Sequence, residues 1–154
     1  MYKLSLRSHK NLIGVHEDLR DVIYRAIKIT EVDFGITEGL RSESRQRELY
    51  NAGASWTMNS RHLTGHAVDV VAYIGNRVSW DWPLYFKIAD AMKQAAIDLD
   101  TPLKWGGSWN IGDFTKENDS SEELNAQYIA YKKSIGGKNN SDGPHFQLPR
   151  GEYK

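Results

Sequence analysis

The sequence of 154 residues contains no cysteine. This absence excludes disulfide bonds, thiolate nucleophiles, thiolate-bound zinc and iron–sulfur clusters. Any metal binding or acid–base chemistry must therefore use histidine, aspartate and glutamate. Few histidines are available for this purpose, since the chain has only five, at positions 9, 16, 62, 66 and 145.

Long apolar runs and a net charge are also absent. No apolar segment approaches the ~18 residues of a membrane span, and residues 1–10 lack the apolar core of a secretory signal. Lys plus Arg number 20 and Asp plus Glu number 20, so no overall basic field favours nucleic acid or anionic lipid. We therefore expect a soluble protein without its own export signal, which neither inserts into membranes nor binds nucleic acid.

The chain length suits one compact domain. Apolar residues make up 40% of the 154 positions, and domains commonly contain about 100 to 150 residues. We found no internal repeat and no low-complexity tract. The expected organisation is a single catalytic domain over residues 1–154, with its core at about residues 15–148.

Four helices are predicted, three from periodic apolar residues and one as a polar helix that Gly53 ends. In the first, Leu19, Val22 and Ile23 begin a stripe with the i, i+3, i+4 spacing of one helical face. In the third, Asp81 stands where it can cap the helix, and Pro83 is acceptable in the first turn. The helices are expected at about residues 16–29, 44–52, 85–99 and 120–135.

Short segments rich in apolar or β-branched residues predict four strands between these helices. The clearest is residues 67–72, because its three valines resist a helix and fit a pleated sheet. The others are expected at about residues 34–36, 103–105 and 145–148. The alternation of single helices with short strands favours an α+β fold, in which a small, mostly antiparallel sheet has helices packed on one side.

The spacing of the histidines allows two interpretations of a metal site. His62 and His66 are four residues apart, as in the His-Glu-x-x-His zinc peptidases, but Leu63 replaces the required glutamate. Pairing His62 with Asp69 fits better if residues 63–65 form a turn and the chain then runs extended. Asp69 would then face back towards His62, whereas the neighbouring valines would face the core.

His145 would supply a third ligand, giving the two imidazoles and one carboxylate that suit a catalytic zinc site. Asp142 lies three residues earlier, across a Gly-Pro turn, where its carboxylate can accept a proton from a water that zinc activates. Taken alone, His62 is better explained as an ordinary loop residue, and Asp142 as an ordinary turn residue. Asp69 is less easily explained in this way, because burying an unpaired carboxylate in a valine-rich strand is costly.

Two motifs together resemble those of a known zinc enzyme family. They are Ser60-x-His62-x-x-Gly65-x-Ala67-x-Asp69 and Asp142-x-x-His145. This is the motif pair of the D-alanyl-D-alanine carboxypeptidase and L-alanyl-D-glutamate peptidase family, which shares its fold with the hedgehog signalling domain. The resemblance extends over most of the chain, through Gly39-Leu40-Arg41 and Trp105-Gly106-Gly107-x-Trp109.

The resemblance implies a role for each residue of the site. Zn²⁺ would be bound by His62, Asp69 and His145. Asp142 would be the catalytic base, and Arg41 would stabilise the negative charge that develops on the carbonyl oxygen. His66 falls on a variable position of the motif and is not expected among the ligands.

Further residues are expected along the substrate groove, namely Ser60, Gln46, Trp105 and Trp109. For Trp105 a place in the hydrophobic core is an equally good interpretation. The acidic residues between positions 113 and 123 offer the oxygen ligands that calcium prefers, but their spacing matches no EF-hand and favours a solvated loop.

Asp142 bears on the choice between activities within the family. Many carboxypeptidase members have glutamate there, whereas aspartate resembles the small phage endolysins that cut between L-alanine and D-glutamate. The expected function is zinc-dependent hydrolysis of the L-Ala–D-Glu bond in the peptidoglycan stem peptide, causing bacterial cell-wall lysis. The alternatives are a D-Ala-D-Ala carboxypeptidase or dipeptidase with the same site, a non-catalytic zinc-containing binding module, and a domain without a site.

Similarity to phage endolysins also implies a setting for the protein. It would be a monomer that stays in the host bacterial cytoplasm until a separate holin permeabilises the membrane. It would then reach the periplasm and the cell wall.

Overall fold

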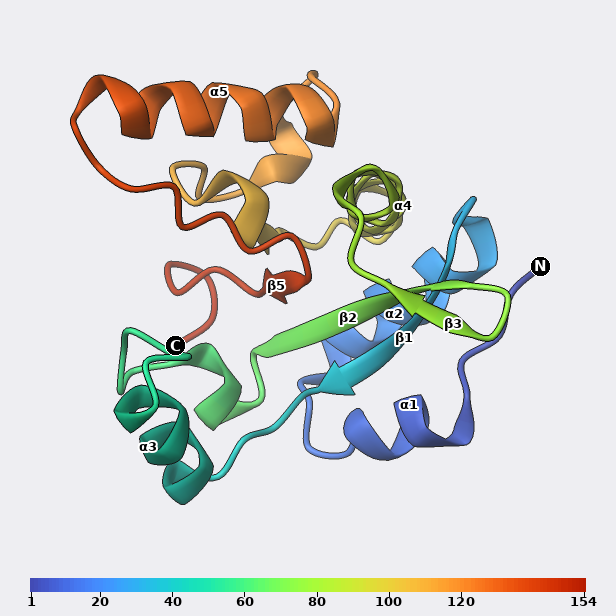
Figure 1. Ribbon diagram of the computed structural model, residues 1–154. Helices are drawn as coiled ribbons and strands as arrows, with labels where there is room; N and C mark the ends of the chain where they lie inside the picture. Colours follow the sequence, from blue (N-terminus) through green and yellow to red (C-terminus); the bar gives the residue numbers. More distant parts are fainter.

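A five-stranded antiparallel sheet runs through the computed structural model, which describes residues 1–154 (Figure 1). The strand order is β1-β2-β5-β4, and β3 pairs with β2 beyond this path. The strands are β1 (Asp33–Glu38), β2 (Ala67–Ile74), β3 (Arg77–Ser79), β4 (Lys104–Trp105) and β5 (His145–Gln147). The predicted α+β class and small antiparallel sheet are confirmed.

Five α-helices surround the sheet: α1 (Leu6–Asn11), α2 (Glu17–Ile29), α3 (Glu43–Asn51), α4 (Trp82–Asp98) and α5 (Ser121–Ser134). Three short 3-10 helices join them: η1 (Arg61–Thr64), η2 (Gly106–Ser108) and η3 (Phe114–Lys116). The last four α-helices are the predicted ones. None of the helices combines the length and the apolar character needed to cross a membrane.

The two predicted capping residues, Ser120 and Asp81, both lie at helix N-caps, but only Ser120 makes a capping hydrogen bond. Ser120 and Glu123 form the capping box that begins α5. Asp81 occupies the N-cap position of α4, but its side chain makes no capping hydrogen bond. Pro83, at the second position of the helix, has no N–H to offer that side chain. Instead, the Leu84 N–H bonds to the backbone carbonyl of Asp81 at 3.1 Å.

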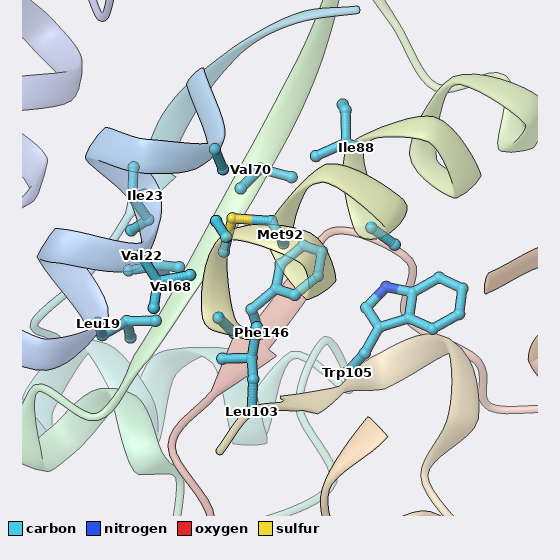
Figure 2. Packing of buried hydrophobic residues seen from close by; sticks show 14 of the residues in the cluster. Leu19, Val22, Ile23, Val68, Val70, Ile88, Met92, Leu103, Trp105 and Phe146 are labelled. Atoms are coloured by element: carbon cyan, nitrogen blue, oxygen red, sulfur yellow. The ribbon is translucent and has the colours of Figure 1, made fainter. Parts of the chain in front are cut away.

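The core lies between one face of the sheet and the helices α2 and α4 (Figure 2). A single cluster of 24 buried apolar residues joins these elements. Contacts at its centre come from Leu19, Val22 and Ile23 of α2, Val68 and Val70 of β2, Ile88 and Met92 of α4, and Phe146 of β5. The apolar stripes seen in the sequence are therefore the faces that hold the helices on the sheet.

The helix α1, which the sequence analysis did not predict, closes the free edge of β1. The Ile36 N–H donates to Ser8 Oγ at 2.9 Å, and Asn11 Nδ2 donates to the Ile36 carbonyl at 2.7 Å. Because an edge strand otherwise presents unpaired backbone groups, this short helix replaces a neighbouring strand.

Alternation along β2 separates the core from the site. Val68 and Val70 are completely buried in the core, and Asp69 between them faces the opposite side of the sheet. The strand is reached through Gly65, which ends η1 in the left-handed conformation at φ +75. A Cβ at Gly65 would lie 2.3 Å from the Gly14 carbonyl oxygen, so only glycine fits this turn. The predicted turn before an extended strand is confirmed.

Candidate metal centre and active site

Three potential metal ligands meet on the face of the sheet away from the core. His62 comes from η1, Asp69 from β2 and His145 from the start of β5. Asp69 and His145 are directly paired across the two strands. One ligand atom from each residue lies within 4.8 Å of the others, and this is the only such group of three or more in the protein.

His62 is oriented by a backbone carbonyl. Its Nδ1 lies 2.8 Å from the Gly39 carbonyl oxygen. Because a carbonyl only accepts, Nδ1 must carry the proton, and in the neutral ring Nε2 then has a free lone pair. This buried Nε2 has no hydrogen-bond partner, and it lies 3.3 Å from Asp69 Oδ2. Two electron-rich atoms face each other here, an arrangement that a cation stabilises.

One ring nitrogen of His145 faces the other carboxylate oxygen of Asp69, and its second ring nitrogen is held by a hydrogen bond. Its Nε2 donates to Gln147 Oε1 at 2.9 Å, and its Nδ1 lies 3.2 Å from Asp69 Oδ1. In tetrahedral coordination, two ligand atoms at about 2.1 Å from zinc are about 3.4 Å apart. The two N···O separations, 3.3 Å and 3.2 Å, are close to this value, and the donor types suit Zn²⁺. Each imidazole also has the outer hydrogen bond typical of a metal-ligating histidine.

The charges of the three residues are coupled. Burial alone would raise the pKa of Asp69, but the adjacent imidazoles of His145 and His62 hold it well below its usual range. Burial lowers the pKa of His145, but Asp69 and Asp142 outweigh it and raise that pKa overall. Asp69 thus remains an ionised carboxylate, the form required of a metal ligand.

Asp142 lies beside the three potential ligands in a groove of about 530 Å³. Its backbone N–H donates to the Gly106 carbonyl at 2.8 Å, which fixes the loop before β5. Part of its surface remains open to solvent, but the groove walls desolvate the carboxyl group and raise its pKa. The nearby charge of Asp69 adds to this rise, whereas His145, His62 and Arg41 oppose it.

Arg41 also lines the groove and is held firmly. Its Nε and Nη2 donate to the two carboxylate oxygens of Glu38, each at 2.7 Å, and its Nη1 donates to Gln46 Oε1 at 2.6 Å. Nη2 also lies 3.6 Å from Asp69 Oδ2. Glu38 was not identified in the sequence, because an irregularity in β1 after Ile36 places it opposite Asp69.

The four residues expected along the groove divide into two pairs. Ser60 and Trp109 line the groove. Ser60 Oγ caps η1 by accepting from the His62 N–H at 3.2 Å, and the Trp109 ring lies 5.1 Å from the His145 ring. These two positions give the groove a polar wall and an aromatic wall next to the ligands.

The other two residues are buried and have no surface to offer a ligand. Gln46 Nε2 donates to Ser55 Oγ at 2.9 Å and to the Thr57 carbonyl at 2.5 Å, while its oxygen holds Arg41. Trp105 lies completely in the core, as the alternative interpretation had it, and its Nε1 donates to the Gly143 carbonyl at 2.8 Å. Both residues therefore support the site from within the fold.

The remaining candidates lie outside the metal group. His66 Nδ1 bonds to Thr64 Oγ1 at 2.7 Å, and His66 is not part of the group of three. The acidic residues from 113 to 123 do not gather into a group of potential ligands. Asp113 instead caps η3, and Glu123 takes part in the capping box of α5.

Comparison with known proteins identifies the family. The family model for the phage L-alanyl-D-glutamate peptidase matches residues 1–132. The chain belongs to this family. Within it, the L-alanyl-D-glutamate peptidase of Escherichia phage T5 is 31% identical over 121 residues, which cover 75% of this chain and 88% of that protein. The predicted resemblance to L-alanyl-D-glutamate peptidases is thus confirmed.

Two further proteins extend the comparison. The L-alanyl-D-glutamate peptidase of Listeria phage A118 is 35% identical over 75 residues, covering 49% of this chain but only 26% of that longer protein. The crystal structure of the L-Ala D-Glu endopeptidase ChiX of Serratia marcescens superposes with a TM-score of 0.76 and 41% identity, covering 98% of this chain and 93% of that one. This likeness covers 98% of the chain, whereas the match to the phage L-alanyl-D-glutamate peptidase model ends at residue 132, before Asp142 and His145.

Proposed function

We propose that the protein is a zinc-dependent endopeptidase that hydrolyses the L-Ala–D-Glu bond of peptidoglycan stem peptides, with Zn²⁺ bound by His62, Asp69 and His145. One observation carries the zinc assignment: the buried Nε2 of His62, which has no hydrogen-bond partner, faces a carboxylate oxygen at 3.3 Å. Membership of the phage L-alanyl-D-glutamate peptidase family supports the bond assignment.

When bound, Zn²⁺ would act as a Lewis acid that polarises the scissile carbonyl and makes water a better nucleophile. Asp142 then serves as general base. Its carboxylate removes the proton from the attacking water and returns it to the leaving amine as the peptide bond breaks. A pKa raised by desolvation and by Asp69 makes this carboxylate a stronger base than an exposed aspartate.

Arg41 stabilises the negative charge that collects on the carbonyl oxygen. Three of its five N–H groups are bound to Glu38 and Gln46, so two remain, one of them on the Nη2 that lies nearest Asp69. Its charge is permanent, and the two partners fix it before the substrate arrives. In this proposal Ser60 and Trp109 line the path of the substrate.

The biological setting follows from the phage relatives. The enzyme would act as a monomer on the bacterial cell wall, after a separate holin has permeabilised the membrane of the host. Until then it would remain in the host cytoplasm. This part of the proposal rests on the two similar phage proteins.

Product analysis tests the proposal directly. Purified peptidoglycan is digested with the protein, and the new termini are identified by mass spectrometry while zinc is measured on the same preparation. We expect a new amino terminus at D-glutamate, one zinc per chain, and loss of activity on chelation that added zinc restores. New carboxyl-terminal products lacking D-alanine would instead show the carboxypeptidase alternative. Bound zinc without any product would show a binding module.

A further inference from the structure

The groove contains one cation that has no partner in the protein. Four basic residues line the groove, and the three arginines among them all donate hydrogen bonds to protein oxygens. Lys104, the fourth, makes no hydrogen bond or ion pair through its ammonium group. Burial lowers its pKa, and no neighbouring carboxylate opposes this effect. A half-buried ammonium without a counterion is costly, so an incoming anion would be stabilised here.

The sheet register places Lys104 on the same face as the metal centre. Lys104 of β4 pairs directly with Gln147 of β5. Directly paired residues project to the same face, and so do residues two apart along a strand. Lys104, Gln147 and His145 therefore share a face, and Lys104 is a diagonal neighbour of a proposed zinc ligand. Diagonal neighbours are about 7 to 8 Å apart, within reach of a long side chain.

The chemistry of the proposed substrate supplies the missing anion. Glutamate has two carboxyl groups, and only one of them can continue the peptide, so the other is a free carboxylate. Its carbon is two or four bonds from the scissile nitrogen, depending on which carboxyl group continues the chain. A cation that recognises this carboxylate must therefore lie beside the metal centre.

We propose that Lys104 is the specificity-determining residue that binds the free carboxylate of the glutamyl residue on the leaving side of the scissile bond. The proposal rests on the proposed function and names the part of the substrate that Lys104 recognises. Trp109 lines the same groove, and its ring lies 5.1 Å from that of His145. A substrate whose glutamyl carboxylate is amidated would lose this charged contact.

Two stem-peptide substrates that differ only in this group test the proposal, one with the free carboxylate and one with a carboxamide. We expect the wild type to favour the carboxylate by roughly 10- to 100-fold in kcat/KM, the range of a charge-assisted hydrogen bond. Lys104→Met, which keeps the aliphatic stem, should abolish this preference, mainly through a higher KM for the carboxylate substrate. Lys104→Arg should keep most of the preference.

Controls separate this inference from its alternatives. Arg150→Met removes the groove cation that already donates to the Asn59 carbonyl, and it should leave the preference intact. A preference that survives Lys104→Met, or that disappears in Arg150→Met, would overturn the proposal. An equal loss on both substrates in Lys104→Met would show a merely structural role.

The proposed function can fail separately, because the wild type would then cleave neither substrate. In that case, calorimetric binding of the glutamyl product peptide to wild type and to Lys104→Met still decides the role of Lys104. Weaker binding by Lys104→Met, confined to the peptide with the free carboxylate, is the expected result. Equal binding by both proteins would contradict it.

Discussion

The ring of His62 is held by the Gly39 carbonyl, 2.8 Å from Nδ1, so that Nε2 is directed at Asp69. Only glycine fits at position 39, because a Cβ there would lie 2.2 Å from the Asn11 carbonyl oxygen. Neither the tautomer nor the direction of His62 depends on a mobile side chain. The fold thus prepares this ligand before any metal binds.

Replacement of His62 by alanine should therefore remove the metal. We expect stoichiometric zinc in the wild type after dialysis and at least about 100-fold weaker binding in His62→Ala. Excess zinc should stabilise the wild type against unfolding, by about 2.7 kcal/mol at a concentration 100 times the Kd, and should not stabilise the variant. His66→Ala is the matched control and should keep both properties. Full zinc content in His62→Ala would contradict the ligand assignment.

Asp142 should be needed for chemistry and not for metal binding. In Asp142→Ala we expect kcat to fall by roughly 100- to 10,000-fold, the usual contribution of a general base, with zinc content unchanged. Asp81→Ala serves as the control, because the Asp81 side chain makes no capping bond in α4. Wall digestion at the wild-type rate by Asp142→Ala would remove the base assignment, and loss of zinc would make Asp142 a ligand.

Gly106 leaves room for the loop that bears Asp142. A Cβ at this position would lie 2.3 Å from the Asp142 carbonyl oxygen, and backbone cannot move aside as a side chain can. Gly106→Ala should cost about 1 to 3 kcal/mol in the free energy of unfolding, the range of overpacked sites, and should lower kcat by displacing Asp142. Denaturant unfolding and wall-digest rates measure the two effects. Gly112→Ala, which meets no atom within 4 Å, should be nearly neutral in both.

The sequence predicts those parts of the fold that repeat a pattern. Apolar stripes indicate α2 and α4, and the valines indicate β2, because each pattern arises from a face of the element that is buried in the core. The side of β2 on which Asp69 lies follows from the same alternation. By contrast, α1 is too short to show a stripe, and it is stabilised by its contacts with the edge of β1. The hairpin to β3 was also missed, although Gly75-Asn76 is a known turn signal.

The residues of the site also differ in how far the sequence predicts them. Motif spacing predicts the three ligands and Asp142, since they depend on local turns and on strand alternation. Glu38 depends on an irregularity in β1, and Lys104 on the register between β4 and β5. Neither has a local signature, because strand register is set by the whole core. For Gln46 the sequence indicates a place near the site but not its burial.

Gln46 should contribute to the positioning of Arg41 and to the free energy of unfolding. Gln46→Leu removes the acceptor for Arg41 Nη1 and the donor for Ser55 Oγ and the Thr57 carbonyl. Buried groups without partners cost about 1 to 3 kcal/mol, so the free energy of unfolding should fall by about that amount. A lower kcat with little change in KM would show loss of Arg41 positioning. Gln127→Leu, at an exposed site, should change neither quantity, and a Gln46→Leu protein as stable as the wild type would contradict the assignment.

The carboxyl-terminal segment should loosen at high pH through Tyr153. Its hydroxyl donates to Asp18 Oδ2 at 2.6 Å, and desolvation together with this bond raises the pKa of Tyr153 to about 12. The unfolded chain loses this proton near the ordinary value of about 10, before the folded chain does. The resulting stabilisation is therefore complete below pH 10 and is lost as the pH rises towards 12. The difference in tyrosinate absorbance between wild type and Tyr153→Phe isolates this group from the other tyrosines. A midpoint near 10 would contradict the assignment, and Asp18→Asn should move the midpoint down towards that value.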